Sequence, residues 1–219
     1  MMRRRGWVVG VAFSLAVAGC SAGQAPEVHR FTLLPPPPAA AFPQNMQIQM
    51  GSVNGVAPFR DTGIAHQSDP YRLDNYKFSR WVAPPTEMIA ETLDHLARQE
   101  VGVSQTTDPE ELPLVLDARI DAFQQVQEGA RSSGLVEIDF CLNQRETGRA
   151  QWCKTLRRSM QAYNDSPDAA AQAIDNCFNQ VLVDLASELS RQAAIPRSKR
   201  APSDLAPGPQ HHHKPLLGR

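Results

Sequence analysis

Two runs of alternating apolar and polar residues, joined by a short turn, constrain the fold of this chain more than any other feature. The first run, from 136 to 142, places every second side chain on an apolar face, which is the period of a half-buried strand. The tripeptide Glu-Thr-Gly then predicts a turn with Gly148 in the left-handed conformation. Residues 136–158 therefore predict a β-hairpin. The apolar face of its first strand consists of Val136, Ile138, Phe140 and Leu142.

The register of this hairpin follows from its turn. A three-residue loop places Arg145 opposite Arg149 and, in steps of two, Cys141 opposite Cys153. Directly opposed cysteines lie close enough for a cross-strand bridge. We therefore predict a disulfide between Cys141 and Cys153. The same register pairs apolar residues on the other face, Leu142 with Trp152 and Ile138 with Leu156, which supports it.

The chain begins with the pattern of an exported bacterial protein. Three arginines precede an apolar run from Trp7 to Val17, which has 11 residues and is too short to span a bilayer as a helix. The letters VAGC at 17–20 then resemble the lipobox of bacterial lipoproteins. This resemblance implies that residues 1–19 are a signal peptide and that Cys20 becomes the acylated first residue. A secretory signal with an incidental cysteine is the alternative.

Acylation of Cys20 would anchor the protein without a membrane-spanning helix. One acyl chain holds a protein only marginally, whereas several make a durable anchor. Ser21 stands where aspartate would retain a lipoprotein at the inner membrane in enterobacteria. We therefore expect attachment to the outer membrane, facing the periplasm, with residues 20–28 as anchor and tether.

Charge separates the remaining chain into a domain and a tail. Residues 20–192 carry 14 Lys and Arg against 22 Asp and Glu, whereas residues 193–219 carry 5 against 1. The acidic part, with a domain expected at 29–192, argues against a nucleic-acid partner, which needs a basic face. The proline-rich, basic end predicts a disordered tail. His211–His213 could trap a metal there, but a solvated tail is favoured because metal ligands need fixed positions.

The third cysteine outside the leader belongs to an amphipathic helix. Between Ala170 and Leu189, Cys177 belongs to a series of apolar residues spaced three and four apart. We therefore expect Cys177 to be a small residue of the core. In the oxidising space of an exported protein, disulfides persist. A bridge between Cys153 and Cys177 is therefore the competing prediction. The cysteines and histidines lack the spacing of a redox or zinc site, so we expect no metal.

The other patterns complete a mixed α/β domain. Strands are predicted at 29–34, 46–53, 62–67, 71–80 and 112–126, and a helix at 86–101. Phe123 interrupts the alternation of the long strand, which indicates a bulge. With the hairpin and the final helix, these elements predict a single α/β domain. It would have a mixed sheet of about six or seven strands and two main helices packed on it.

Candidate catalytic groups do not assemble in the sequence. Gly51–Gly55 has its serine one residue out of frame for a nucleophile elbow. His66 and His95 are isolated and expected at the surface. Asp117 and Asp121 share the polar face of a strand, where a solvated face is favoured over an acid pair. We therefore expect no enzyme and no cofactor, since a phosphate-binding glycine loop is also missing.

Positive charge gathers on the predicted hairpin. These residues could meet lipid headgroups or an acidic partner, or protect a sheet edge from aggregation. Both interpretations remain open from the sequence. The residues are Arg145, Arg149, Lys154, Arg157 and Arg158.

A strand-to-helix junction precedes the first helix. Pro84 and Pro85 suit a helix start, because a fixed φ and missing N–H groups cost little in the first turn. Trp81 would cover this corner. Arg80 remains a possible partner contact.

The stretch from 58 to 96 resembles the ABC-type transport auxiliary lipoprotein family, the PqiC-like proteins. In that resemblance 31–33 stands for the first-strand motif and 71–76 for the hairpin. The family's Arg-Trp-Ala-acidic-Pro signature falls on Arg80, Trp81 and Pro84. Val and Ala occupy 82 and 83, where the family has alanine and an acidic residue.

The resemblance implies a function beside a transporter. It implies a non-catalytic outer-membrane lipoprotein that works with an Mce-domain protein of an ABC transporter in moving lipids or other hydrophobic molecules. The protein would dock the transporter's periplasmic part to the outer membrane. It could do so as a ring-shaped homo-oligomer. The alternative is an envelope lipoprotein that binds and regulates a cell-wall synthase.

Overall fold

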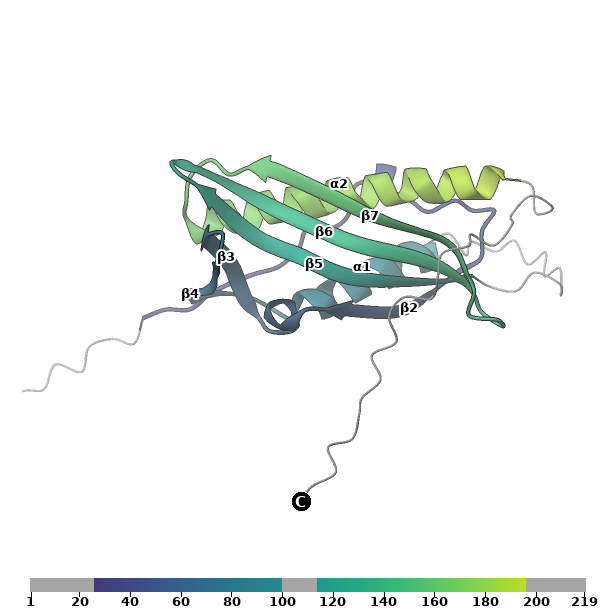
Figure 1. The fold of residues 1–219 in the computed structure, drawn as a ribbon, viewed down its shortest axis with the longest axis horizontal. Helices are drawn as coiled ribbons and strands as arrows, with labels where there is room; N and C mark the ends of the chain where they lie inside the picture. The colour runs from purple at the N-terminus through teal and green to yellow at the C-terminus, as the bar shows by residue number, and fades with distance from the viewer. Residues whose placement is uncertain (1–25, 100–113, 196–219) are drawn as a thin grey trace, which may run out of the picture.

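The computed structural model describes residues 26–99 and 114–195 (Figure 1). Cys20, the expected signal peptide and His211–His213 lie outside the described residues. Within these ranges no helix is long and apolar enough to cross a membrane. The elements, in chain order, are β1 (His29–Phe31), η1 (Pro38–Ala40), β2 (Ile48–Gly55), η2 (Ala57–Arg60), β3 (Gly63–Asp69), β4 (Arg72–Trp81), α1 (Pro85–Gln99), β5 (Leu114–Glu128), β6 (Arg131–Gln144), β7 (Ala150–Gln161) and α2 (Pro167–Ala194).

The predicted α/β class is confirmed: seven strands form one mixed sheet, with two α-helices packed on it. The sheet order is β1-β4-β3-β5-β6-β7, and β2 also pairs with β5. Because β6 occupies one edge of β5 along its whole length, β2 and β3 share the other edge, both parallel to β5. β2 takes the first half of this edge and β3 the second. The strands β5, β6 and β7 form an antiparallel meander.

Both helices cover the same face of the sheet, and no described helix or strand covers the other face of β5–β7 (Figure 1). α1 packs on β2, and α2 runs across β6 and β7. The inward side chains of the strands and helices form one buried hydrophobic cluster. Representative members are Leu116, Ile120, Ile138, Phe140, Ile89, Leu93, Phe178 and Leu185, all 0% exposed. The molecule is therefore a two-layer structure with one open face.

The backbones of β6 and α2 touch at Gly134. A β-carbon there would lie 2.5 Å from the carbonyl carbon of Ala173 and 2.6 Å from the nitrogen of Ile174. The adjacent Cys177 thiol donates a hydrogen bond to the Gly134 carbonyl at 3.3 Å, and burial raises the thiol pKa to about 11. Cys177 is thus the buried core residue expected from its spacing. The competing Cys153–Cys177 disulfide is wrong, because Cys153 is bridged to Cys141.

A bulge in β5 reverses the faces of its side chains. The register with β6 shifts between Ile120 and Ala122, so Asp121 is the extra residue. This confirms the bulge predicted from Phe123. After the bulge Phe123 points into the core, where its ring centre lies 5.5 Å from that of Trp81 and 6.3 Å from that of Phe178. Because of the bulge, β5 places side chains in the core both before it, such as Ile120, and after it, such as Phe123.

The junction before α1 is structural. Trp81 is the last residue of β4 and 0% exposed, and its backbone N–H donates to the Thr62 carbonyl. The Pro84 carbonyl accepts hydrogen bonds from Glu87 and Met88, and α1 begins at Pro85, as the helix-entry interpretation predicts. Arg80 is exposed.

The proline-rich segment after β1 is held against α2. Asp175 of α2 is almost fully buried and accepts a hydrogen bond from the Leu34 backbone N–H at 2.9 Å. Burial raises the pKa of Asp175, although this hydrogen bond opposes the rise. Farther along, Ala40, Phe42 and Met46 are buried in the core. The segment thus closes one side of the core before β2 begins.

The hairpin register is right at its centre and wrong at its turn. Cys141 faces Cys153, and the predicted pairs Leu142–Trp152 and Ile138–Leu156 are formed. Arg145 and Arg149, however, are not opposite each other: the N–H of Gln144 donates to the Arg149 carbonyl. The loop therefore has four residues, and a register shift at Leu142/Asn143 restores the alignment. Gly148 has φ +64°, the left-handed conformation predicted. At the far end, α2 extends to Ala194, two residues beyond the expected domain limit.

Gly134→Ala tests the contact between β6 and α2. Because the new methyl group would meet backbone atoms rather than a flexible side chain, α2 must shift, and we expect a loss of about 3 kcal/mol in the free energy of unfolding. Urea denaturation measures it. Gly129→Ala is the control: that site has φ +62° and no atom within 4 Å, so only the cost of the left-handed conformation applies, about 1 kcal/mol. Equal losses in both variants would contradict the close contact.

Candidate functional site: the open face of the sheet

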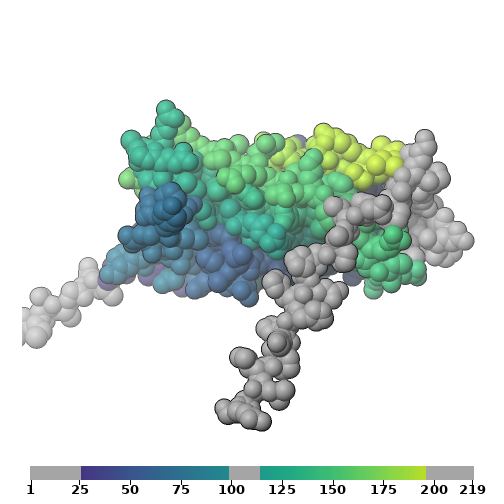
Figure 2. Space-filling model, viewed as in Figure 1, coloured from purple at the N-terminus to yellow at the C-terminus, as the bar shows by residue number. Residues whose placement is uncertain are grey.

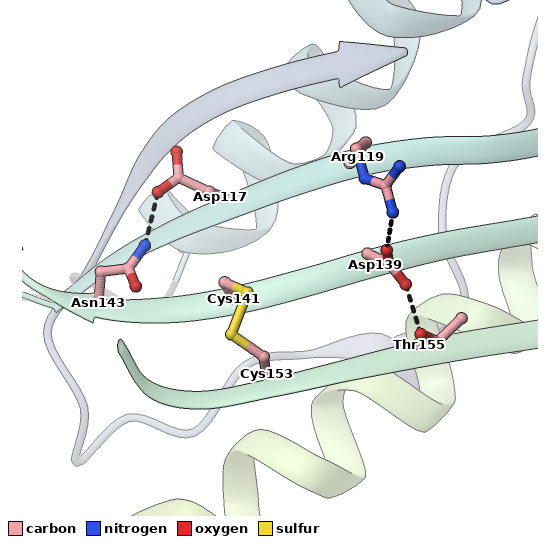
Figure 3. The surroundings of a disulfide bond; sticks show 7 residues. All are labelled: Asp117, Arg119, Asp139, Cys141, Asn143, Cys153 and Thr155. Carbon is pink, nitrogen blue, oxygen red and sulfur yellow. Dashed lines mark hydrogen bonds and ion pairs between the residues drawn. A yellow bond between two sulfur atoms is a disulfide. The ribbon is translucent and has the colours of Figure 1, made fainter. Parts of the chain in front are cut away.

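The face of β5, β6 and β7 opposite the helices is turned toward the viewer in Figures 1 and 2, and its side chains are mostly polar. It carries the side chains that alternate with the core residues, so its composition follows from the period of the strands. Opposite charges and hydrogen-bonding groups face one another across neighbouring strands (Figure 3). The residues are Asp117, Arg119 and Asp121 of β5, Glu137, Asp139, Cys141 and Asn143 of β6, and Cys153, Thr155 and Arg157 of β7.

The disulfide lies within this surface. Cys141 and Cys153 are bridged across β6 and β7, with their Cα atoms 4.1 Å apart. Figure 3 shows the bridge between the Asp117–Asn143 hydrogen bond and the group formed by Arg119, Asp139 and Thr155. Bonding of both sulfurs leaves no thiol for nucleophilic chemistry here, and the bridge is a covalent staple of the open face.

Asp117 holds a bulge in the neighbouring strand β2. Its Oδ1 accepts hydrogen bonds from the backbone N–H and the hydroxyl of Ser52, at 2.7 and 2.8 Å. Its Oδ2 accepts one from the Asn143 side chain at 2.7 Å. A β-carbon at Gly51 would lie 2.4 Å from the same carboxylate, so only glycine leaves room for it. Ser52, the serine of the failed elbow match, is thus used to fix β2 to β5.

Two carboxylates meet beside the β5 bulge. Asp121 shares a hydrogen bond with Asp139, and Arg119 forms ion pairs with both. Burial raises the pKa of Asp121, and the Asp139 charge adds to the rise while Arg119 opposes it. Burial also opposes ionisation of Asp139, but hydrogen bonds from Thr155 and Arg119 outweigh it and lower the Asp139 pKa. The carboxylate beside Asp121 is therefore Asp139, and Asp117, with which an acid pair was the less favoured interpretation of the sequence, bonds to Ser52 and Asn143 instead.

A shallow hollow of about 270 Å³ lies at one end of the open face, where β3 meets β5. Its lining mixes apolar and polar side chains, and neither Asp117 nor Asp121 belongs to it. No group of three His, Cys, Asp or Glu in the described parts of the chain could hold a metal ion. The carboxylates that line the hollow are Asp69 and Glu128. Lining residues include Gln67, Pro70, Val126, Leu135, Arg157 and Ser159.

The two histidines of interest occupy different environments. His95 is exposed on α1, as expected. His66 is half-buried, and its ring lies 4.6 Å from that of Tyr76, so the surface position expected for it is wrong. Tyr76 in turn donates to Gln125, which donates to the Ser132 hydroxyl, forming a buried polar chain beneath the β3–β4 hairpin. Burial raises the Tyr76 pKa.

The basic residues of the hairpin do not form one patch. Lys154 and Arg158 reach α2, where they pair with Glu188 and Asp184, each at 2.6 Å. Arg157 points to the open face and pairs with Glu137 at 2.5 Å. Arg145 donates to the side chain of Gln49 on β2. The strand alternation thus divides these charges between two faces, and carboxylates neutralise three of them.

Sequence reasoning missed Asp139 and Asp175. The pairing of Asp139 with Thr155, and of Glu137 with Arg157, follows from the same register that aligned the cysteines, so this signal was present. Asp175 gave no such signal, because its partner, Leu34, is 141 residues away in the chain.

Removal of the disulfide tests its contribution to stability. The bridge closes a loop of 12 residues, so Cys141→Ala with Cys153→Ala is expected to lower the free energy of unfolding by roughly 3 kcal/mol. Urea denaturation with and without reductant measures this loss: reductant should weaken the natural protein and leave the double variant unchanged. Cys177→Ser is the control for thiol effects. Free Cys141 in peptides from the unreduced protein would refute the bridge.

The carboxylate pair predicts opposite effects of two neutral substitutions. Because the Asp139 pKa is lowered on folding, its charge stabilises the protein above the usual carboxyl range, and this gain is lost as the pH falls through the lowered pKa. Asp139→Asn should therefore cost about 1 kcal/mol of unfolding free energy at pH 7 and little in strong acid. Asp121→Asn should cause no loss at pH 7, because the raised pKa shows that folding disfavours its charge. Urea denaturation at several pH values compares them, and equal losses would contradict these assignments.

Comparison with known proteins agrees with this architecture. Protein XCC0632 from Xanthomonas campestris, described by the family model DUF330, has a crystal structure that superposes with a TM-score of 0.62 at 16% sequence identity, covering 75% of this chain and 97% of that one. An uncharacterised protein gives 0.58 at 15% identity, covering 75% and 99%. These likenesses show the fold.

The family itself is shown by sequence. No curated protein sequence matches the chain. The model of the ABC-type transport auxiliary lipoprotein component matches residues 31–186, which span β1 to the middle of α2 and include the Arg80-Trp81 junction. The chain therefore belongs to the family of ABC-type transport auxiliary lipoprotein components.

Proposed function

We propose that the protein is a non-catalytic outer-membrane lipoprotein of an Mce-type ABC transport system that moves lipids or other hydrophobic molecules across the cell envelope. The observation that carries the proposal is the family match over residues 31–186. The lipobox-like sequence ending at Cys20 supports a lipid anchor, and Ser21 supports the outer membrane. The protein would face the periplasm and contact an Mce-domain protein.

The filled core supports a docking role over a carrying role. Side chains from both helices occupy the inner face of the sheet, and large side chains there, including Trp81, Phe123 and Phe178, are fully buried. A carrier of acyl chains needs an apolar cavity, since ligand sites for such molecules are concave and apolar. The hollow on the open face is shallow and partly polar. We therefore assign transport of the hydrophobic molecule to the partner and positioning to this protein.

The open edge of β7 supports assembly into a homo-oligomer. β7 stands at the end of the sheet, and among the described residues it pairs only with β6, so one edge of its 12 residues has no strand partner there. Such an edge is a template for pairing with another chain. A second copy could cover it, and a ring of copies would surround the transporter's periplasmic end.

Affinity purification tests this function. The protein, tagged at its C terminus and carrying its lipid, is crosslinked in intact cells and purified from membranes. We expect an Mce-domain protein among the recovered partners. Cys20→Ala is the matched control: it should become soluble in the periplasm and lose most of this recovery, because the domain is no longer held at the membrane.

Three outcomes would count against the proposal. Continued membrane association of Cys20→Ala would refute the anchor. Recovery of no Mce-domain protein with the lipidated form would refute the transport role, and recovery of a cell-wall synthase in its place would favour the regulatory alternative.

A further inference from the structure

One end of the molecule exposes large apolar side chains. Tyr71, at the β3–β4 turn, is 96% exposed, and Tyr163, in the β7–α2 connection, is 67% exposed. Leu73, two residues after Tyr71, is 40% exposed. Exposed tyrosines of this kind have an apolar ring and a polar tip, which suits a boundary between water and an apolar phase.

The sheet topology brings these residues to one end. β3 runs parallel to β5, with Gln67 opposite Val126, so the β3–β4 turn lies level with the β5–β6 turn. The end of β7 pairs with the start of β6, Gln161 near Ser133, so the β7–α2 connection lies at the same end. Figure 1 shows the three connections together on the left of the view. The β6–β7 turn lies at the opposite end.

The described chain also begins at this end. In Figure 1 the segment before β1 starts beside the β3–β4 hairpin, on the left. Only five residues lie between Cys20 and Pro26, so six residue-to-residue steps join them. At a maximum of about 3.5 Å per residue, they span about 20 Å. Acyl chains on Cys20 would therefore hold the lipid surface within about 20 Å of Pro26, which lies toward the end that carries Tyr71.

The β3–β4 turn presents Tyr71 in a fixed way. The Asp69 carboxylate accepts a hydrogen bond from the Tyr71 backbone N–H at 2.8 Å, a local bond that stiffens the turn. The turn has no excess of positive charge: Arg72 pairs with Asp74 at 3.0 Å, Arg131 and Glu128 flank the neighbouring β5–β6 turn, and Asp69 adds one negative charge. Contact with lipid at this end would then depend on apolar side chains and not on net charge.

We propose that the β3–β4 turn, with Tyr71 at its tip and Leu73 beside it, is a second membrane contact that rests in the interface of the leaflet holding Cys20. This inference rests on the proposed lipid anchor. The anchor and the turn together fix the domain's orientation, with its long axis away from the membrane and the β6–β7 turn farthest from it. A single flexible tether would leave that orientation free.

Quenching of tryptophan by brominated lipid tests the contact. The lipidated protein is reconstituted in vesicles of phosphatidylcholine with acyl chains brominated near the headgroup. Tyr71→Trp places an indole at the turn, and Glu146→Trp places one in the exposed β6–β7 turn as the matched control. We expect brominated lipid to remove roughly half or more of the emission added by Tyr71→Trp, because interfacial indoles lie at headgroup level. The emission added by Glu146→Trp should not change, and high salt should not reduce the quenching at 71.

Flotation of the same vesicles separates the two hypotheses. Protein that floats while the indole at 71 escapes quenching overturns the membrane contact and leaves the anchor intact. Equal quenching at 71 and 146 also overturns it, because the domain would then have no fixed orientation. Protein that fails to float overturns the anchor, and the inference falls with it. Quenching at 71 alone, in floating protein, supports the inference.

Discussion

The close contact between α2 and the inner face of the sheet determines the rest of this structure. Gly134 lets the two backbones touch, and Cys177 and Phe178 fill the space on either side. With α2 in this place, the Asp175 carboxylate accepts a hydrogen bond from the Leu34 backbone N–H. The proline-rich segment before β2 therefore packs against the helix. Because both helices occupy one face, the opposite face of β5–β7 carries polar side chains. Hydrogen bonds and ion pairs between neighbouring strands hold these side chains in place.

Local patterns predicted the hairpin well because its register depends on neighbours in the chain. Alternation fixed the faces of β6, and the turn brought Cys141 to Cys153. The length of the turn was wrong by one residue, since a bulge near Gln151 compensates for a four-residue loop and alternation alone cannot show it. The helix start at Pro85 was equally predictable, because proline restricts the backbone at that position itself.

Contacts between distant segments could not be predicted in the same way. β2 and β3 share one edge of β5, an arrangement that depends on where the β5 bulge lies and on the length of β5. Asp117 was expected on a solvated face, yet its carboxylate bonds to Ser52, 65 residues earlier, and to Asn143 on the next strand. The sequence shows which face a side chain takes. The partner on that face depends on the order of strands.

The two exposed regions differ in a way that bears on their roles. On the open face, charged side chains form ion pairs with residues of the neighbouring strand, as Arg119 does with Asp139 and Arg157 with Glu137. A protein that docks there must complement these ion pairs or replace them with its own. Such matching gives selectivity, because an ill-fitting partner leaves charges unpaired. Tyr71 at the end of the molecule requires no such match, and a lipid surface offers none. The end that carries Tyr71 is therefore suited to a membrane, whose surface has no fixed pattern of charged groups. The open face is suited to a protein with complementary charges.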